Sequence, residues 1–117
     1  MSEKKVVIII PLENSCSSCS QMTLNELVGM EEKFRKDVLL VFTARSEKLI
    51  QETLSDLNLN SFQIEKDLKY ESWKMGLVDN NPRFYLIKSN SLMRSEGITF
   101  QNIADQMPKI INFLNEY

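Results

Sequence analysis

The feature that most constrains this chain is a short apolar run followed by a pair of cysteines. Residues 6–10 read Val-Val-Ile-Ile-Ile, and such a β-branched run is typical of a strand buried on both faces. Cys16 and Cys19 are the only cysteines, and a helical pattern begins at Ser17. The Cys-x-x-Cys pair is therefore predicted at a strand–helix junction, where backbone N–H groups and the helix dipole stabilise a thiolate.

The composition indicates one domain of ordinary type. The chain has 117 residues, of which 43% are hydrophobic and 26% are charged, and this suffices for a core without disulfide staples. The net charge of −2, with Lys and Arg scattered, gives no reason to expect nucleic acid or an anionic membrane as a partner. We expect a single domain over residues 1–117 and a monomer.

The absence of histidine narrows the chemistry. It removes the commonest general base and the commonest metal ligand. A structural zinc site normally needs four Cys or His ligands, and this chain offers two, so zinc would require two subunits to pool their cysteines. We expect neither a metal nor a cofactor.

The start of the sequence bears on location. The first apolar stretch is too short to span a bilayer, and no small-residue cleavage site follows it. As it stands the sequence predicts a cytoplasmic protein. A periplasmic or exported protein is the alternative if residues 1–5 are the trimmed start of a longer chain, and two cysteines do not decide between these.

Apolar segments alternate between strand and helix periodicities, which predicts an α/β fold with a central mixed sheet flanked by helices. The predicted strands cover residues 5–11, 38–43, 62–65, 83–88 and 92–96, the last two forming a hairpin with a tight turn at 89–91. The predicted helices cover residues 17–34, 47–57 with Ser46 as N-cap, 67–75 ended by Gly76, and 99–115 with a kink or break at Pro108 near Met107.

Other conspicuous side chains are interpreted as structural. Trp73, Tyr70 and Phe84 are predicted to be packing residues rather than a platform for a ligand. The charged clusters at 31–33 and 35–37 are predicted to be solvated helix surface and its exit.

Three stretches resemble the thioredoxin-like superfamily, and within it the TlpA-like branch of bacterial thiol–disulfide oxidoreductases. The first is the strand, Cys16-Ser17-Ser18-Cys19 and the helix. The second is residues 61–67 with Tyr70, Trp73 and residues 76–78. The third is Asn81-Pro82, residues 83–87, a turn and Gly97, which is similar to the family's cis-proline, hairpin and closing glycine. The likeness covers nearly the whole chain from Lys5 and implies a thioredoxin-like fold.

The chain departs from the family's pattern at the residues that handle protons. The family's buried aspartate falls at Ile10, and the glutamate of some TlpA-like members falls at Met22. The aromatic residue that often precedes the first cysteine is Ser15, and the usual Thr before the proline is Asn81. Glu13 is the nearest carboxylate in sequence, on the loop before the cysteines.

Four residues are the candidate site. Cys16 is the candidate nucleophile, exposed at a helix start, and Cys19, one turn further in, is the candidate resolving thiol. The alternative is a structural disulfide or two small apolar side chains. Pro82 is expected to be cis, with the Asn81 backbone exposed to an extended substrate segment. A trans proline that starts an edge strand is the alternative.

The predicted function is a thiol–disulfide oxidoreductase that acts on protein disulfides and is recycled by an external thiol-redox partner. Ser17 and Ser18 add no positive charge, so the activation of Cys16 would come mainly from the helix dipole, typically about 0.3–1 kcal/mol and up to about 2 kcal/mol in favourable geometry. This favours a moderately reducing or isomerase-like potential. The rival is a redox-inactive binding module of the same fold, with a structural or vestigial cysteine pair.

Overall fold

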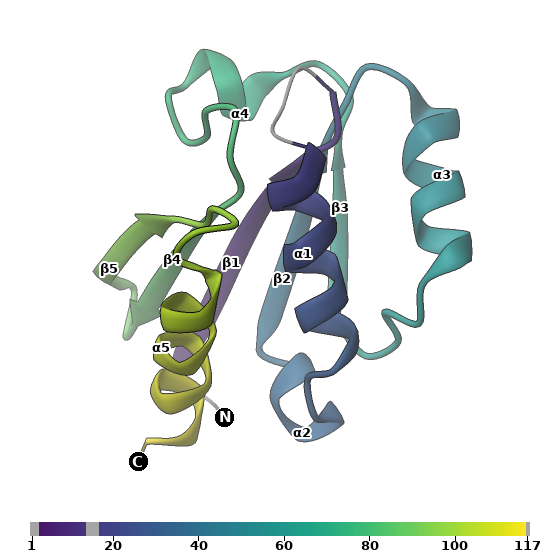
Figure 1. The fold of residues 1–117 in the computed structure, drawn as a ribbon. Coiled ribbons are helices and arrows are strands. Elements are labelled where there is room, and N and C mark those ends of the chain that lie inside the picture. The colour runs from purple at the N-terminus through teal and green to yellow at the C-terminus, as the bar shows by residue number, and fades with distance from the viewer. Residues whose placement is uncertain (1–2, 14–16, 117) are drawn as a thin grey trace.

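The computed structural model describes residues 3–13 and 17–116, which form a five-stranded sheet with helices packed on it (Figure 1). The strands are β1 (Lys4–Pro11), β2 (Val38–Thr43), β3 (Gln63–Asp67), β4 (Arg83–Lys88) and β5 (Ser91–Gly97). The helices are α1 (Ser17–Val28), α2 (Glu32–Arg35), α3 (Glu47–Asp56), α4 (Glu71–Lys74) and α5 (Ile103–Asn115). This mixed sheet flanked by helices confirms the predicted fold class.

The sheet is mixed, with strand order β3-β2-β1-β4-β5. β1 lies at its centre, parallel to β2 and antiparallel to β4, so that Ile8 lies opposite both Leu40 and Phe84. β3 extends the parallel part and β5 pairs antiparallel with β4. Because β4 runs antiparallel to β1, the carboxyl ends of β1, β2 and β3 and the amino end of β4 lie at the same end of the sheet.

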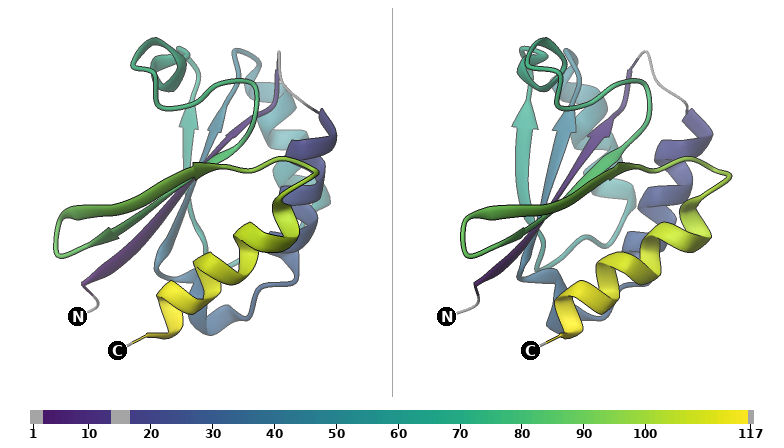
Figure 2. Two further views of the ribbon diagram at one scale, coloured as in Figure 1. Left: turned by 60° about the vertical axis from the view of Figure 1, so that its left-hand side comes forward. Right: turned by 90° about the vertical axis from the view of Figure 1, so that its left-hand side faces the viewer.

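The core lies between the sheet and a single layer of helices. Turned views show α1, α3 and α5 on the same side of the strands, while the short α4 lies beyond the strand ends (Figure 2). Burying a side chain such as Leu or Phe contributes about 1.5–3 kcal/mol. The largest fully buried side chains come from strands, from helices and from the loop after β5: Phe42, Phe84, Ile8, Ile10, Leu27, Leu40, Ile50, Ile98 and Ile110.

The helix expected over residues 17–34 is two helices, so that prediction was wrong. α1 ends at Val28, and the amides of Gly29 and Met30 make shorter-range bonds to Glu26 and Leu27 (3.1 and 3.0 Å). Glycine costs about 1 kcal/mol in a helix interior, and Met30 gains more by turning into the core, where it is 6% exposed. The chain then extends before α2.

Most other local predictions are confirmed. The Ser46 side chain caps α3 by accepting from the Leu49 amide at 3.2 Å. Gly76 closes α4 with φ +72°, although α4 is shorter than predicted. Ser89 and Asn90 both have positive φ, which suits the two-residue turn of a tight hairpin. The edge strand expected at 62–65 is β3, shifted by one or two residues.

Of the kink or break expected at Pro108, the break is absent, because α5 runs without interruption over Ile103–Asn115. Pro108 removes the amide that would bond to the carbonyl of Ala104. Both residues are exposed, so water can satisfy that carbonyl and the helix continues.

Arg35, which the sequence pattern places on solvated surface, is buried with 4% exposure. Its guanidinium lies 4.8 Å from the ring centre of Phe62. It donates to four backbone carbonyls, those of Val28 (2.8 Å), Met30 (3.0 Å), Asn58 (3.2 Å) and Asn60 (3.0 Å). The side chain therefore joins the end of α1 to the connection between α3 and β3.

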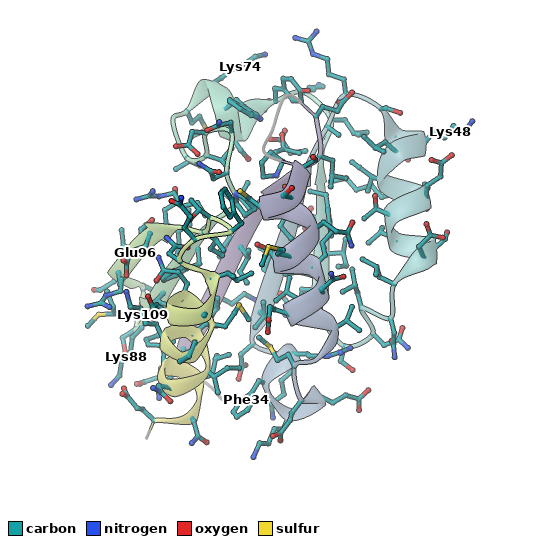
Figure 3. All side chains as sticks on the ribbon, viewed as in Figure 1. Phe34, Lys48, Lys74, Lys88, Glu96 and Lys109 are labelled. Atoms are coloured by element: carbon teal, nitrogen blue, oxygen red, sulfur yellow. The ribbon has the colours of Figure 1, made fainter. Side chains whose placement is uncertain are left out.

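An ion pair joins β5 to α5. Lys109 Nζ lies 3.2 Å from both carboxylate oxygens of Glu96, and Figure 3 shows these labelled side chains near one another. Burial raises the pKa of Glu96, but the hydrogen bond and the charge of Lys109 outweigh it and hold that pKa below its usual value. By contrast, the labelled Lys48 and Lys74 extend away from the molecule (Figure 3).

Candidate functional site

The candidate site lies at the end of the sheet where β1, β2 and β3 end and β4 begins. Backbone hydrogen bonds continue past the strand ends, from Leu12 N to Thr43 O (3.1 Å) and from Ala44 N to Asp67 O (3.2 Å). β1 pairs with β4 as far as Ile9 opposite Arg83, so the chain just before β4 lies beside the end of β1. The segment that leads toward the cysteines and the segment that contains Pro82 therefore share this end of the sheet (Figure 1).

Cys19 lies in the first turn of α1 and is 2% exposed. Its neighbour Ser20 is also buried and donates from Oγ to the carbonyl of Pro11 at 2.8 Å. Thr23 Oγ1 donates to the carbonyl of Cys19 at 2.8 Å. The first turn of α1 is thus held against the end of β1. Cys16, the predicted nucleophile, lies outside the described residues.

The cis-proline prediction was wrong. No peptide bond between the described residues is cis, so Asn81 and Pro82 are joined by a trans bond. The Asn81 amide donates to Asp79 Oδ1 at 2.9 Å, which forms a side-chain turn just before the proline. Pro82 is buried, and its carbonyl accepts from Ile98 N at 2.7 Å. It precedes β4, which is an interior strand rather than an edge.

The two positions that carry acids in the resembling family are apolar here and lie in different surroundings. Ile10 is fully buried in the core, and Met22 is 39% exposed on α1. Neither can take up a proton from a thiol. Glu13 and Asp67 are two carboxylates that the structure does bring to this end of the sheet.

Glu13 is half-buried and turned toward the second and third strands. Its Oε1 accepts from the backbone amide of Arg45, which follows β2. The same oxygen accepts from the hydroxyl of Tyr70 at 3.2 Å. The Arg45 guanidinium lies 4.9 Å from the ring centre of Tyr70. Sequence reasoning noticed Glu13 but could not find this contact, because Tyr70 is 57 positions away.

The aromatic residues have different surroundings. Phe84 is fully buried in the core, as predicted. Tyr70 and Trp73 are half-buried, with ring centres 6.2 Å apart. Trp73 Nε1 is buried and makes no hydrogen bond within the described part of the chain.

Asp67, at the end of β3, holds the start of α4. Its Oδ1 accepts from the Glu71 amide at 2.9 Å and its Oδ2 from the Ser72 amide at 2.8 Å. Burial raises the pKa of Asp67, but the N–H groups of Ser72 and Glu71 outweigh it and hold that pKa below its ordinary value of 3.8. The ionised side chain therefore stabilises the fold.

We expect Asp67→Asn to lower the free energy of unfolding at neutral pH by about 1 kcal/mol, because an amide oxygen accepts these bonds less strongly. The folded pKa is below the unfolded one, so this stability is present above pH 3.8 and is lost as the pH falls through the lower folded pKa. Urea unfolding of both proteins from pH 7 downward should show the difference shrinking. The control is Glu65→Gln, which replaces an exposed carboxylate on β3. A constant difference down to about pH 2 would contradict this assignment.

No metal site or membrane span is found in the described part of the chain. Within residues 3–13 and 17–116, no group of three or more His, Cys, Asp or Glu side chains is arranged to hold a metal ion. None of the helices described is long and apolar enough to cross a bilayer.

No protein-family model matches this chain, and no curated protein matches its sequence. Solved structures do match its fold. A candidate thiol:disulfide interchange protein DsbE from Chlorobium tepidum has a TM-score of 0.74 at 15% identity, over 97% of this chain and 82% of that one. The exposed lipoprotein thioredoxin Etrx1 of Streptococcus pneumoniae has a TM-score of 0.63 at 18% identity, over 92% and 84%. StoA from Bacillus subtilis has 0.55 at 13% identity, over 94% and 83%. The fold is therefore thioredoxin-like.

Proposed function

We propose that this chain is a thiol–disulfide oxidoreductase that acts on protein disulfides, with Cys16 as nucleophile and Cys19 as resolving thiol. The observation that carries the proposal is the position of Cys19, which is buried in the first turn of the helix that follows the central strand. The interchange proteins and thioredoxin that share this fold support the same chemistry.

The reaction transfers two electrons in two exchange steps. The Cys16 thiolate attacks one sulfur of the substrate disulfide, and the other substrate sulfur leaves as a thiolate. Cys19 then loses its proton and attacks the Cys16 sulfur, which releases the second substrate thiol. The substrate is reduced, and Cys16 and Cys19 are oxidised to a disulfide. A dithiol partner protein restores the reduced pair, and no cofactor is needed.

Asn81 and Pro82 are proposed to dock the substrate. They precede β4, next to the carboxyl end of β1, so they lie at the same end of the sheet as the chain that leads to Cys16. The Asn81 amide already donates to Asp79. Docking through this residue therefore relies on its carbonyl and side chain, with Pro82 as a buried support.

The surroundings of the cysteines favour a modest activation. The first turn of α1 contains no acidic residue that would oppose a thiolate, and Ser17 and Ser18 bring no positive charge. The helix dipole is then the main stabilising influence, and it corresponds to a fall of about one unit in the pKa of Cys16. A moderately reducing or isomerase-like couple fits this better than a strong oxidant.

A redox-inactive binding module of the same fold is the second candidate. The observation that favours it is that Ile10 and Met22 stand where related oxidoreductases have proton-accepting carboxylates. A module of this kind would keep the cysteine pair as a structural disulfide or as inert thiols.

The pH dependence of thiol alkylation separates the two candidates. The reduced Cys19→Ser variant leaves Cys16 as the only thiol, and its iodoacetamide rate should follow a thiolate with a pKa about one unit below the free value of about 8.5. Cys16→Ser is the matched control, since the buried Cys19 should react slowly. A Cys16 pKa at or above the free value would favour the binding module.

A further inference from the structure

We propose that Glu13 is a positioning residue of the redox site: bound to Arg45 and Tyr70, it fixes the chain that leads to Cys16 and so favours the disulfide form. This inference rests on the proposed function. It assigns Glu13 a structural part in the cysteine couple, as an anchor rather than as a proton acceptor.

The first support is the pair of hydrogen bonds on one carboxylate oxygen. Oε1 of Glu13 accepts from the Arg45 amide, on the segment after β2, and from the Tyr70 hydroxyl, on the segment after β3. A single side chain on the segment after β1 is thus bound to the segments that follow β2 and β3, the two strands on one side of β1. Bonds to an ionised carboxylate are stronger than those between neutral groups.

The second support is that Tyr70 is itself firmly held. Its backbone adopts φ +56°, a left-handed conformation that costs energy for a residue with a side chain. The Arg45 guanidinium covers its ring, and Asp67 fixes the helix that begins at the next residue. The hydroxyl therefore presents a fixed donor to Glu13.

The third support comes from the other side of the cysteines. Ser20 donates to the carbonyl of Pro11, which ties the first turn of α1 to the end of β1. Cys19 is the residue next to this contact. The chain is thus anchored both before residue 14 and after residue 16, by contacts that the described residues make with the end of the sheet.

These anchors bear on the redox equilibrium through chain entropy. Glu13 precedes Cys16 by three residues, so their Cα atoms are at most about 11 Å apart. Forming a disulfide removes conformational freedom that the dithiol form retains. An anchor that restricts the dithiol form lowers this cost. Losing the anchor should therefore shift the equilibrium toward the dithiol.

Three variants separate position from charge, with the equilibrium constant for oxidation by glutathione as the readout. Glu13→Ala removes both hydrogen bonds and should lower this constant about tenfold. Tyr70→Phe removes one bond, keeps the ring, and should lower it about threefold. Glu13→Gln keeps a carbonyl oxygen that can accept both bonds, less strongly without the charge, and should lower the constant about threefold, clearly less than Glu13→Ala.

Tyr85→Phe is the matched control, because the Tyr85 hydroxyl binds the carbonyl of Leu77 on a different loop and should leave the constant unchanged. Thermal unfolding checks that each variant is folded. If Glu13→Ala does not fold, Tyr70→Phe still tests the inference. Unchanged equilibrium constants in Glu13→Ala and Tyr70→Phe would overturn this inference but not the proposed function. A shift in Glu13→Gln equal to that in Glu13→Ala would do the same. A wild-type protein without any measurable couple would overturn the proposed function as well.

Discussion

Replacing Cys16 with serine is expected to abolish disulfide turnover, whereas replacing Cys19 with serine is expected to trap the protein in mixed disulfides with its substrates. A serine hydroxyl is not ionised at neutral pH, so the first exchange step has no nucleophile in Cys16→Ser. In Cys19→Ser the first step proceeds, but no thiol remains to attack the Cys16 sulfur. Reduction of a peptide disulfide that releases a fluorophore, with dithiothreitol as reductant, measures turnover. Intact mass detects the trapped adduct after a single turnover without dithiothreitol, because that dithiol would itself cleave the mixed disulfide.

Ser18→Ala is the matched control for these variants. Ser18 is exposed between the cysteines, and the substitution keeps both thiols. Its turnover should stay within about threefold of wild type. Turnover in Cys16→Ser equal to wild type would rule out the assigned nucleophile. A Cys19→Ser protein that turns over normally and gathers no adduct would rule out the resolving role of Cys19.

Replacing Arg35 with methionine is expected to lower the free energy of unfolding by about 3–5 kcal/mol. Arg35 is 4% exposed, and its guanidinium donates to backbone carbonyls in two separate segments of the chain. Methionine has a similar length but removes the hydrogen-bond donors that these carbonyls accept from Arg35. It also removes the contact between the guanidinium and the ring of Phe62. Urea unfolding measures the loss.

Two further substitutions test the cause. Arg35→Lys keeps the charge but not the planar fork of donors, so it should lose more than half as much as Arg35→Met. Lys33→Met, two residues earlier in α2, removes a lysine whose side chain is 65% exposed and should change stability by less than about 0.5 kcal/mol. A loss below about 1 kcal/mol in Arg35→Met would show that this side chain does not hold the two segments together.

The sequence predicted those parts of the fold that depend on local pattern. β1 and β2 follow from continuous apolar runs, and the Ser46 cap and the hairpin turn at Ser89 follow from residue types with known backbone preferences. The end of α1 was missed because Phe34 continues the apolar spacing by chance, although Gly29 interrupts the helix. The break at Pro108 was overpredicted because exposure of the freed carbonyl cannot be read from sequence.

Contacts between distant segments were beyond the sequence. The acceptors of Arg35 include the carbonyls of Asn58 and Asn60, so its burial depends on a loop more than twenty positions away. The contact between Glu13 and Tyr70 has the same character. The isomer at Pro82 was missed for a different reason, since the cis bond was expected from the family resemblance and the chain instead has a trans bond there, after a side-chain turn made by Asp79.

The candidate site was predictable in part. The spacing of Cys16 and Cys19 after a buried strand indicated where to look for the proposed chemistry, and the burial of Cys19 agrees with the role of an inner thiol. The roles of Asn81 and Pro82 stay predictions. The sequence showed that Ile10 and Met22 are not acids, but only the fold brought Glu13 into contact with the segments after β2 and β3.

The most direct test of the proposed function is an equilibrium redox titration in glutathione buffers and then dithiothreitol buffers, read by thiol alkylation and intact mass. We predict a single two-electron transition between about −120 and −270 mV, the range of known thiol–disulfide catalysts, and nearer its reducing end. A midpoint below about −300 mV, which marks a structural disulfide, or no disulfide at any poise would contradict the proposal and favour the binding module.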